Sequence, residues 1–170
     1  MLPNSSQHIL RPVRARTVVF SFVGALFLVF LPWTDLRLVP DFVALVLVFW
    51  CVHQPRLIGL GTGWFVGLLV DAGNGVFLGQ HALAYSCLAF LAVGLSRRIL
   101  WLGIWGQALY VGGLLVAALG VASIVRLATG AQFPGWSIAI GPLLGLAMWP
   151  ALSWLLLLPQ RRPVESRDRL

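Results

Sequence analysis

The sequence contains few charged residues. They make up 10% of its 170 residues, whereas an ordinary soluble domain carries roughly a quarter. So few charges cannot cover a globule of this size with polar groups. With 59% hydrophobic residues and a mean hydropathy of +0.92, the chain instead requires a bilayer as its apolar solvent. We interpret it as an integral membrane protein, not as a soluble domain or a soluble enzyme.

Lysine is absent, so all 12 basic residues are arginines, and the formal net charge is +7. A nucleic-acid-binding module would need a basic face with stacking aromatics. Here the arginines separate apolar runs, which is the pattern of membrane topology. The sequence therefore predicts no nucleic-acid partner. Its arginine-rich tails are expected to contact anionic lipid of the bilayer or cytoplasmic proteins.

The usual signs of a reactive centre are also missing. The two cysteines, Cys51 and Cys87, lie in apolar runs without a CxxC pair, so we interpret both as small buried hydrophobic residues. The sequence shows no Ser/His/Asp set, no paired catalytic carboxylates and no P-loop. It therefore predicts no catalytic residue, no metal site and no cofactor.

What the chain does contain is a series of apolar runs. They cover residues 17–31, 38–52, 57–70, 76–95, 99–127 and 136–158. The fifth run would be about 43 Å long as a helix, against a hydrocarbon core of about 30 Å, so its span is expected to begin near Gly103. Trp50, Trp101 and Trp105 are predicted to lie at membrane interfaces. The sequence thus predicts an all-α bundle of six membrane helices over 17–158, between basic tails 1–16 and 159–170.

The positions of the arginines predict the orientation. Six spans place ten arginines on one side and only Arg37 and Arg126 on the other. Because an excess of basic residues marks the cytoplasmic side, we expect both termini in the cytoplasm. The first run ends in Pro32-Trp33 and not in small residues, which favours a retained helix over a cleavable signal peptide.

Six residues around the third run are spaced four apart in number: Gly59, Gly63, Gly67, Asp71, Gly75 and Gly79. Residues four apart lie on one face of a helix. Gly59, Gly63 and Gly67 therefore form a groove that serves either ordinary packing inside the bundle or the docking of a partner's span. The segment 71–75 contains Asn-Gly and is expected to break the helix.

Asp71 is the candidate buried polar or pocket residue, because a carboxylate at the bilayer centre costs about 2.5–3.5 kcal/mol. Either it binds backbone N–H groups of the turn 72–75, or it contacts a proton, a ligand or a partner. Asp35 and Asp41 map to the same outer side, as a shallow acidic pocket or as solvated loop residues. His53 and His81 are predicted on opposite sides, where they cannot share a metal ion. No second catalytic group is expected beside Asp71 or His81.

Two stretches carry a family resemblance. The first contains Pro32-Trp33 and Pro40-Asp41 before an apolar run. The second continues through the glycine series to Gly75 and Gly79. Together they resemble the rod shape-determining protein MreD family over about residues 17–93. In this comparison Pro32, Trp33, Pro40, Asp41, Gly75 and Gly79 are structural motif residues.

The resemblance implies a non-enzymatic scaffold subunit of the bacterial elongation machinery, in the cytoplasmic (inner) membrane. Its implied direct partner is the bitopic protein MreC. The MreB filaments, the RodA glycosyltransferase and a penicillin-binding transpeptidase would belong to the same complex, which couples the inside of the cell to lateral peptidoglycan synthesis and maintains rod shape. The implied fold is similar to that of the S components of vitamin transporters.

That similarity leaves an alternative, a small-molecule-binding transporter subunit with Asp71 at its site. Such S components present a small-residue AxxxA face on their first helix to a coupling subunit. In the run 17–31 only Gly24 and Ala25 are small and nonpolar, which speaks against this alternative.

Overall fold

The computed structural model describes residues 15–31, 40–132 and 135–158, which form an all-helical bundle. Its elements are α1 (Ala15–Phe30), α2 (Phe42–His53), α3 (Leu60–Asn74), α4 (Gln80–Leu100), α5 (Ile104–Ala128), the 3-10 helix η1 (Trp136–Ala139) and α6 (Ile140–Leu157). The prediction of six α-helices is confirmed, and the described residues contain no strand.

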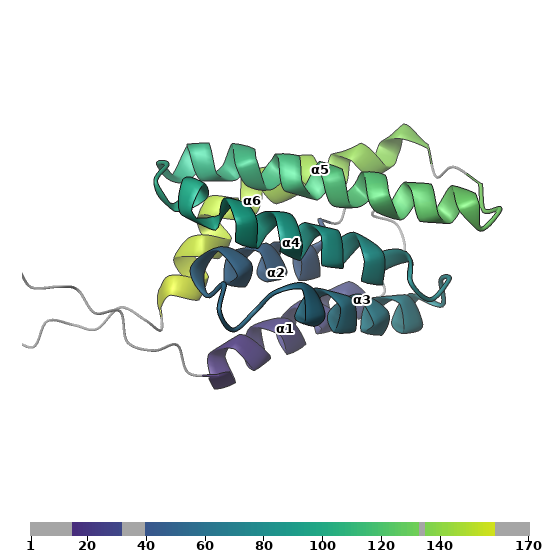
Figure 1. Cartoon of the computed structure of the whole chain (residues 1–170), viewed down its shortest axis with the longest axis horizontal. Helices are drawn as coiled ribbons and strands as arrows, with labels where there is room; N and C mark the ends of the chain where they lie inside the picture. Colours follow the sequence, from purple (N-terminus) through teal and green to yellow (C-terminus); the bar gives the residue numbers. More distant parts are fainter. Residues whose placement is uncertain (1–14, 32–39, 133–134, 159–170) are drawn as a thin grey trace, which may run out of the picture.

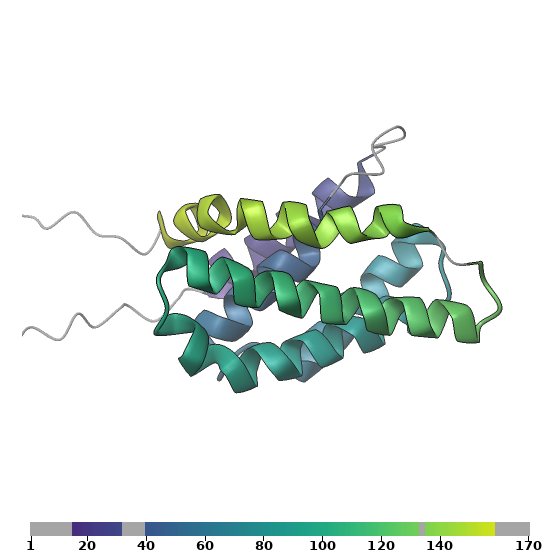
Figure 2. The same cartoon turned by 90° about the horizontal axis from the view of Figure 1, so that it is seen from above.

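Successive helices run in opposite directions along one common axis (Figures 1 and 2). The first residues of α1 and the last residues of α6 lie at the same end of the bundle, which we call the terminal end. The opposite end, which we call the far end, holds the connection from α3 to α4 and the one from α5 to α6. Six alternating helices produce this arrangement because an even number of crossings returns the chain to its starting side.

The helices differ in their capacity to cross a bilayer. By length and composition α4, α5 and α6 are candidate membrane spans, while α1 and α2 are shorter apolar helices. The 12 residues of α2 extend only about 18 Å at 1.5 Å per residue. All residues from Val43 to Val52 are buried, so this short helix is enclosed by the rest of the bundle.

Trp50 shows how the central helix is held. We predicted it at an interface, but its side chain is fully buried inside the bundle and so does not face the lipid. Its indole Nε1 donates a 2.7 Å hydrogen bond to Ser21 Oγ of α1, and that hydroxyl donates to Val18 O. Trp101 and Trp105, by contrast, are highly exposed, as an interfacial position requires. Cys51 is buried as predicted, but Cys87 is exposed.

The third helix is longer than predicted. We expected a break from Asp71 onward, but α3 continues to Asn74 and ends at Gly75, whose φ of 61° is left-handed. The Gly75 N–H bonds to Asp71 O. A glycine just after a helix accepts this conformation without the penalty that a Cβ imposes. The start of α5 after Gly103 agrees with the prediction.

The glycine groove of α3 faces α4 of the same chain. A Cβ at Gly63 would overlap the backbone carbonyl of Tyr85, and one at Gly67 would overlap the backbone of His81 and Ala82. The expectation of a partner's span at this face is therefore corrected, because α4 already occupies it. Gly59 precedes the helix and has no atom near its Cβ position, so it takes no part in the contact.

We predict that Gly67→Ala destabilises the fold severely, because the new methyl group would meet backbone atoms of Ala82 that no side-chain rotation can move. Overpacking of this kind costs about 1–3 kcal/mol or more. Gly61→Ala on the same helix meets open space and should be neutral or stabilising, since alanine favours a helix by about 1 kcal/mol. Thermal unfolding in detergent measures both variants. Equal unfolding temperatures would contradict the close approach of α3 and α4.

Candidate functional site

Asp71 is fully buried and accepts several hydrogen bonds. Its carboxylate receives the backbone N–H groups of Gly79 at 2.9 Å, of His81 at 2.9 and 3.1 Å and of Ala82 at 3.3 Å. These amides belong to the beginning of α4. We had offered the amides of the turn 72–75 as partners, and the structure shows that the partners lie beyond that turn.

The position of these amides explains how a buried carboxylate is tolerated. The first N–H groups of a helix lack partners within the helix and carry its positive dipole end. The N-cap of α4 is Gly79, which has no side chain to fill this role and has a φ of 110°. Asp71 supplies the missing acceptor from the end of α3. The turn from Gly75 to Gly79 allows this because both glycines adopt positive φ values.

His81 joins the same carboxylate through its side chain. Its Nδ1 lies 2.7 Å from Asp71 Oδ1. An ionised carboxylate offers only acceptors, so Nδ1 carries the proton and Nε2 is the nitrogen left for other contacts. The imidazole is 22% exposed. Sequence reasoning expected no second catalytic group beside Asp71 or His81, and it did not foresee that these two side chains would bind each other.

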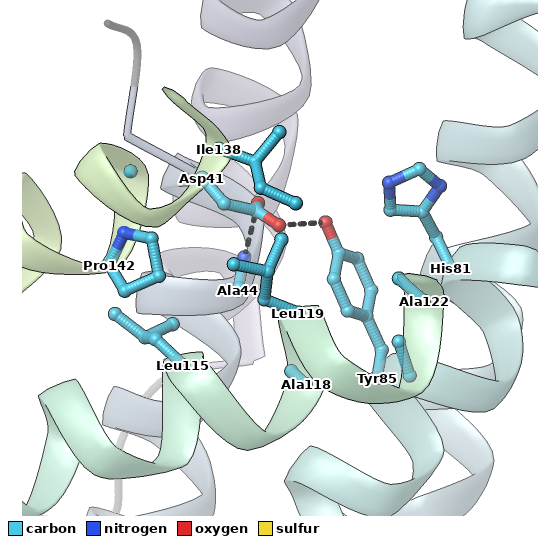
Figure 3. A pocket seen from close by; sticks show the side chains of 12 residues that line it. Asp41, Ala44, His81, Tyr85, Leu115, Ala118, Leu119, Ala122, Ile138 and Pro142 are labelled. Carbon is cyan, nitrogen blue, oxygen red and sulfur yellow. Dashed lines mark hydrogen bonds between the residues drawn. The ribbon is translucent and has the colours of Figure 1, made fainter. Parts of the chain in front are cut away.

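Asp41 makes a second connection between helices (Figure 3). Its Oδ1 accepts the N–H of Ala44 at 2.9 Å and thereby caps α2. Its Oδ2 accepts the hydroxyl of Tyr85 of α4 at 2.6 Å. Tyr85 is buried, so this hydrogen bond satisfies its phenol hydroxyl inside the bundle. Asp41 is therefore not a merely solvated loop acid.

A pocket of about 240 Å³ lies beside these groups, between α2, α4, α5 and the start of α6. Asp41, His81 and Tyr85 provide its polar lining (Figure 3). The rest of the lining is apolar: Ala44, Ala84, Leu115, Ala118, Leu119, Ala122, Ile138, Gly141 and Pro142. Asp71 does not line the pocket; its partner His81 does. The pocket belongs to the far end of the bundle, where α2, α4 and α6 begin.

The site combines an imidazole, a phenol and a carboxylate. His81 lies next to Asp71 and against the ring of Tyr85, with ring centroids 5.8 Å apart. Among the described residues, no group of three or more His, Cys, Asp or Glu side chains is placed to hold a metal ion. What the three lining groups offer together is hydrogen bonding to a small occupant.

The other residues singled out from the sequence are distributed as follows. His53 lies at the end of α2, with its Nδ1 2.9 Å from Phe49 O, and thus at the opposite end of the bundle from His81, as predicted. Pro40 is buried directly before Asp41. Pro32, Trp33 and Asp35 lie outside the described residues. Sequence reasoning missed Tyr85, because nothing in the spacing of 44 residues links it to Asp41.

Comparisons with known proteins point to one family. The family model described as rod shape-determining protein MreD matches residues 9–158. The chain is also similar to the rod shape-determining protein MreD of Haemophilus influenzae. The two are 26% identical over 147 residues, which cover 85% of this chain and 89% of that protein. No solved structure shows a significant match, so the expected similarity to S components stays a prediction.

We predict that Asp71→Ala costs more stability than His81→Ala. The first change leaves three backbone amides and an imidazole without their buried acceptor, and breaking a buried pair in this way costs about 3–5 kcal/mol. The second removes only the imidazole and keeps the backbone amides bonded. Thermal unfolding of both purified variants tests this order, and a larger loss in His81→Ala would contradict it.

Proposed function

We propose a membrane scaffold role for this chain, which belongs to the rod shape-determining protein MreD family. In this proposal the chain is a non-enzymatic subunit of the elongation machinery. It binds an MreC-like bitopic protein directly. Through this chain and its MreC-like partner, the complex couples MreB filaments inside the cell to the RodA glycosyltransferase and its penicillin-binding transpeptidase. It thereby couples the filaments to lateral peptidoglycan synthesis.

The family match carries the proposal, because it extends over residues 9–158 and so includes every described helix. The match and the named relative both point to the determination of rod shape. The architecture agrees, since the described residues form a single bundle of helices with short connections. A chain of this form acts through its outer faces, its pocket or its tails.

The structure limits where a partner's span can dock. The groove at Gly63 and Gly67 is filled by α4, so docking has to use an outward face of the bundle. The outward face of α1 is one such surface, and it exposes large apolar side chains. These are Val19, Phe20, Val23 and Phe27. Lipid covers such a face in the absence of a partner.

We further propose the bacterial inner membrane as the location, with both termini in the cytoplasm. Among the described arginines, Arg16, Arg56, Arg97 and Arg98 stand at the terminal end of the bundle, and Arg126 stands at the far end. This distribution supports a cytoplasmic terminal end, because basic residues are enriched on the cytoplasmic side. The pocket then opens toward the periplasmic half of the membrane.

Depletion in a rod-shaped bacterium that carries no second copy tests the scaffold role. We expect depleted cells to become round, and we expect the native protein to co-purify with an MreC-like partner from detergent-solubilised membranes. Re-expression of Gly61→Ala should restore rods, because that position is unpacked. Cells that remain normal rods after complete depletion would refute the proposal.

The orientation has its own test. Alkaline phosphatase, which is active only after export, should be inactive when fused after Leu170 and active when inserted after Gly130 in the connection that follows α5. A fluorescent protein fused after Leu170 should fluoresce, since it folds in the cytoplasm. The reverse pattern of phosphatase activity would show that the bundle has the opposite orientation.

A second candidate function is the small-molecule-binding subunit of a transporter, and the pocket is the observation that favours it. The outward face of α1 speaks against it, because Phe20 and Phe27 stand where a coupling subunit would need small residues. Co-purification of a coupling ATPase module together with a tightly bound vitamin would favour this candidate over the scaffold.

A further inference from the structure

We propose that the pocket at the far end binds an ammonium group carried on a short aliphatic stem. The inference goes beyond the scaffold role and does not depend on it. It rests on the polar groups that line the pocket, on their total charge, and on the size and apolar nature of the remaining wall. The chemical class of the occupant follows from these three features together.

The polar groups of the pocket are arranged to accept hydrogen bonds. Asp41 uses its two oxygens to accept from Ala44 N and from the Tyr85 hydroxyl, and each carboxylate oxygen retains a further lone pair. The Tyr85 hydroxyl donates its proton in the hydrogen bond to Asp41, and its oxygen can still accept a hydrogen bond. Nε2 of neutral His81 is an acceptor, because Nδ1 carries the proton toward Asp71. A cluster of acceptors complements a ligand rich in donors, and an ammonium group has three.

The charge of the site favours the same ligand. With both carboxylates ionised and His81 in the neutral form that its acceptor role requires, Asp41 and Asp71 give the site a total charge of −2. No arginine lines the pocket. Arg126 lies one turn beyond Ala122, but its Nε donates to Gln132 O in the following connection. A cation in this partly dehydrated place gains more from the carboxylates than it would in water.

The apolar wall and the volume define the rest of the ligand. The side chains of Leu115, Ala118, Leu119 and Pro142 surround the space next to Asp41 (Figure 3). The pocket measures about 240 Å³. An apolar cavity of about 150 Å³ holds benzene, whereas drug-sized ligands occupy roughly 300–1,000 Å³. The pocket therefore suits a group of the size of pentylammonium.

Such a group can come from two sources, a soluble aliphatic amine or the ammonium of an aminophospholipid headgroup. Both present the same donors to Asp41. They differ in how they arrive, because the headgroup is available only when the surrounding bilayer contains it. The experiment separates the sources by changing the lipid.

The test uses the purified full-length chain in detergent, titrated with pentylammonium and, as a neutral control of similar shape, 1-pentanol. Binding is followed by calorimetry and by the shift in unfolding temperature. We expect saturable binding of pentylammonium at least tenfold tighter than that of pentanol. Equal affinities, or no binding of pentylammonium, would overturn the proposal.

A matched pair of leucine variants and one asparagine variant locate the binding. Ala118→Leu fills the pocket without altering a charge, and Ala117→Leu places the same bulk on the exposed face of α5. We expect a loss of at least tenfold in pentylammonium affinity in the first variant and none in the second. Asp41→Asn should remove the preference for pentylammonium over pentanol. If Asp41→Asn does not fold, the two leucine variants still test the location of the site. Equal pentylammonium affinity in Ala118→Leu and Ala117→Leu refutes the site.

The same titration in nanodiscs assigns the source of the ammonium group. If the headgroup occupies the pocket, nanodiscs of phosphatidylethanolamine should weaken pentylammonium binding relative to nanodiscs of phosphatidylglycerol. Equal binding in both lipids assigns the pocket to a soluble amine. Both results uphold an ammonium site, whereas no saturable binding in either lipid counts against it.

Discussion

The contact between the Asp71 carboxylate and the first amides of α4 joins the end of α3 to the beginning of α4. A buried carboxylate and a buried helix start are each unfavourable alone, since one lacks donors and the other lacks acceptors. Each supplies what the other needs at distances of 2.9 to 3.3 Å. The same carboxylate orients the His81 imidazole, so the placement of α4 and the orientation of a pocket side chain share one cause.

The glycines of α3 and the hydrogen bond from Tyr85 to Asp41 support this contact. The absence of a side chain at Gly63 and Gly67 brings α3 and α4 to backbone contact, which places Asp71 within reach of the α4 amides. On the other side of α4, Tyr85 donates to Asp41 and ties the helix to the start of the buried α2. The pocket is the space left where α5 and the start of α6 complete this arrangement.

The sequence was sufficient for the fold class and the helix count, because hydropathy and arginine placement act over whole segments. It also indicated that Gly63, Gly67 and Asp71 share one face, since helical periodicity is local. It could not show that α4 occupies that face, because a small-residue groove is equally suited to a partner's helix. The sequence also could not show the pairing of Asp71 with His81. That pairing requires the chain to reverse its direction between Gly75 and Gly79, and the path of this turn depends on the positive φ values of the two glycines. Tyr85 and Asp41 belong to different helices, so only the packed structure unites them.

The most direct test of this account is hydrogen exchange at the start of α4 in wild-type protein and in Asp71→Asn, both in nanodiscs. Because the carboxylate accepts the N–H groups of Gly79, His81 and Ala82, we predict faster exchange of these amides in the variant, by about tenfold for a loss of about 1.4 kcal/mol. Exchange in the middle of α5 should stay unchanged. Equal exchange at the start of α4 in both proteins would contradict the role assigned to Asp71.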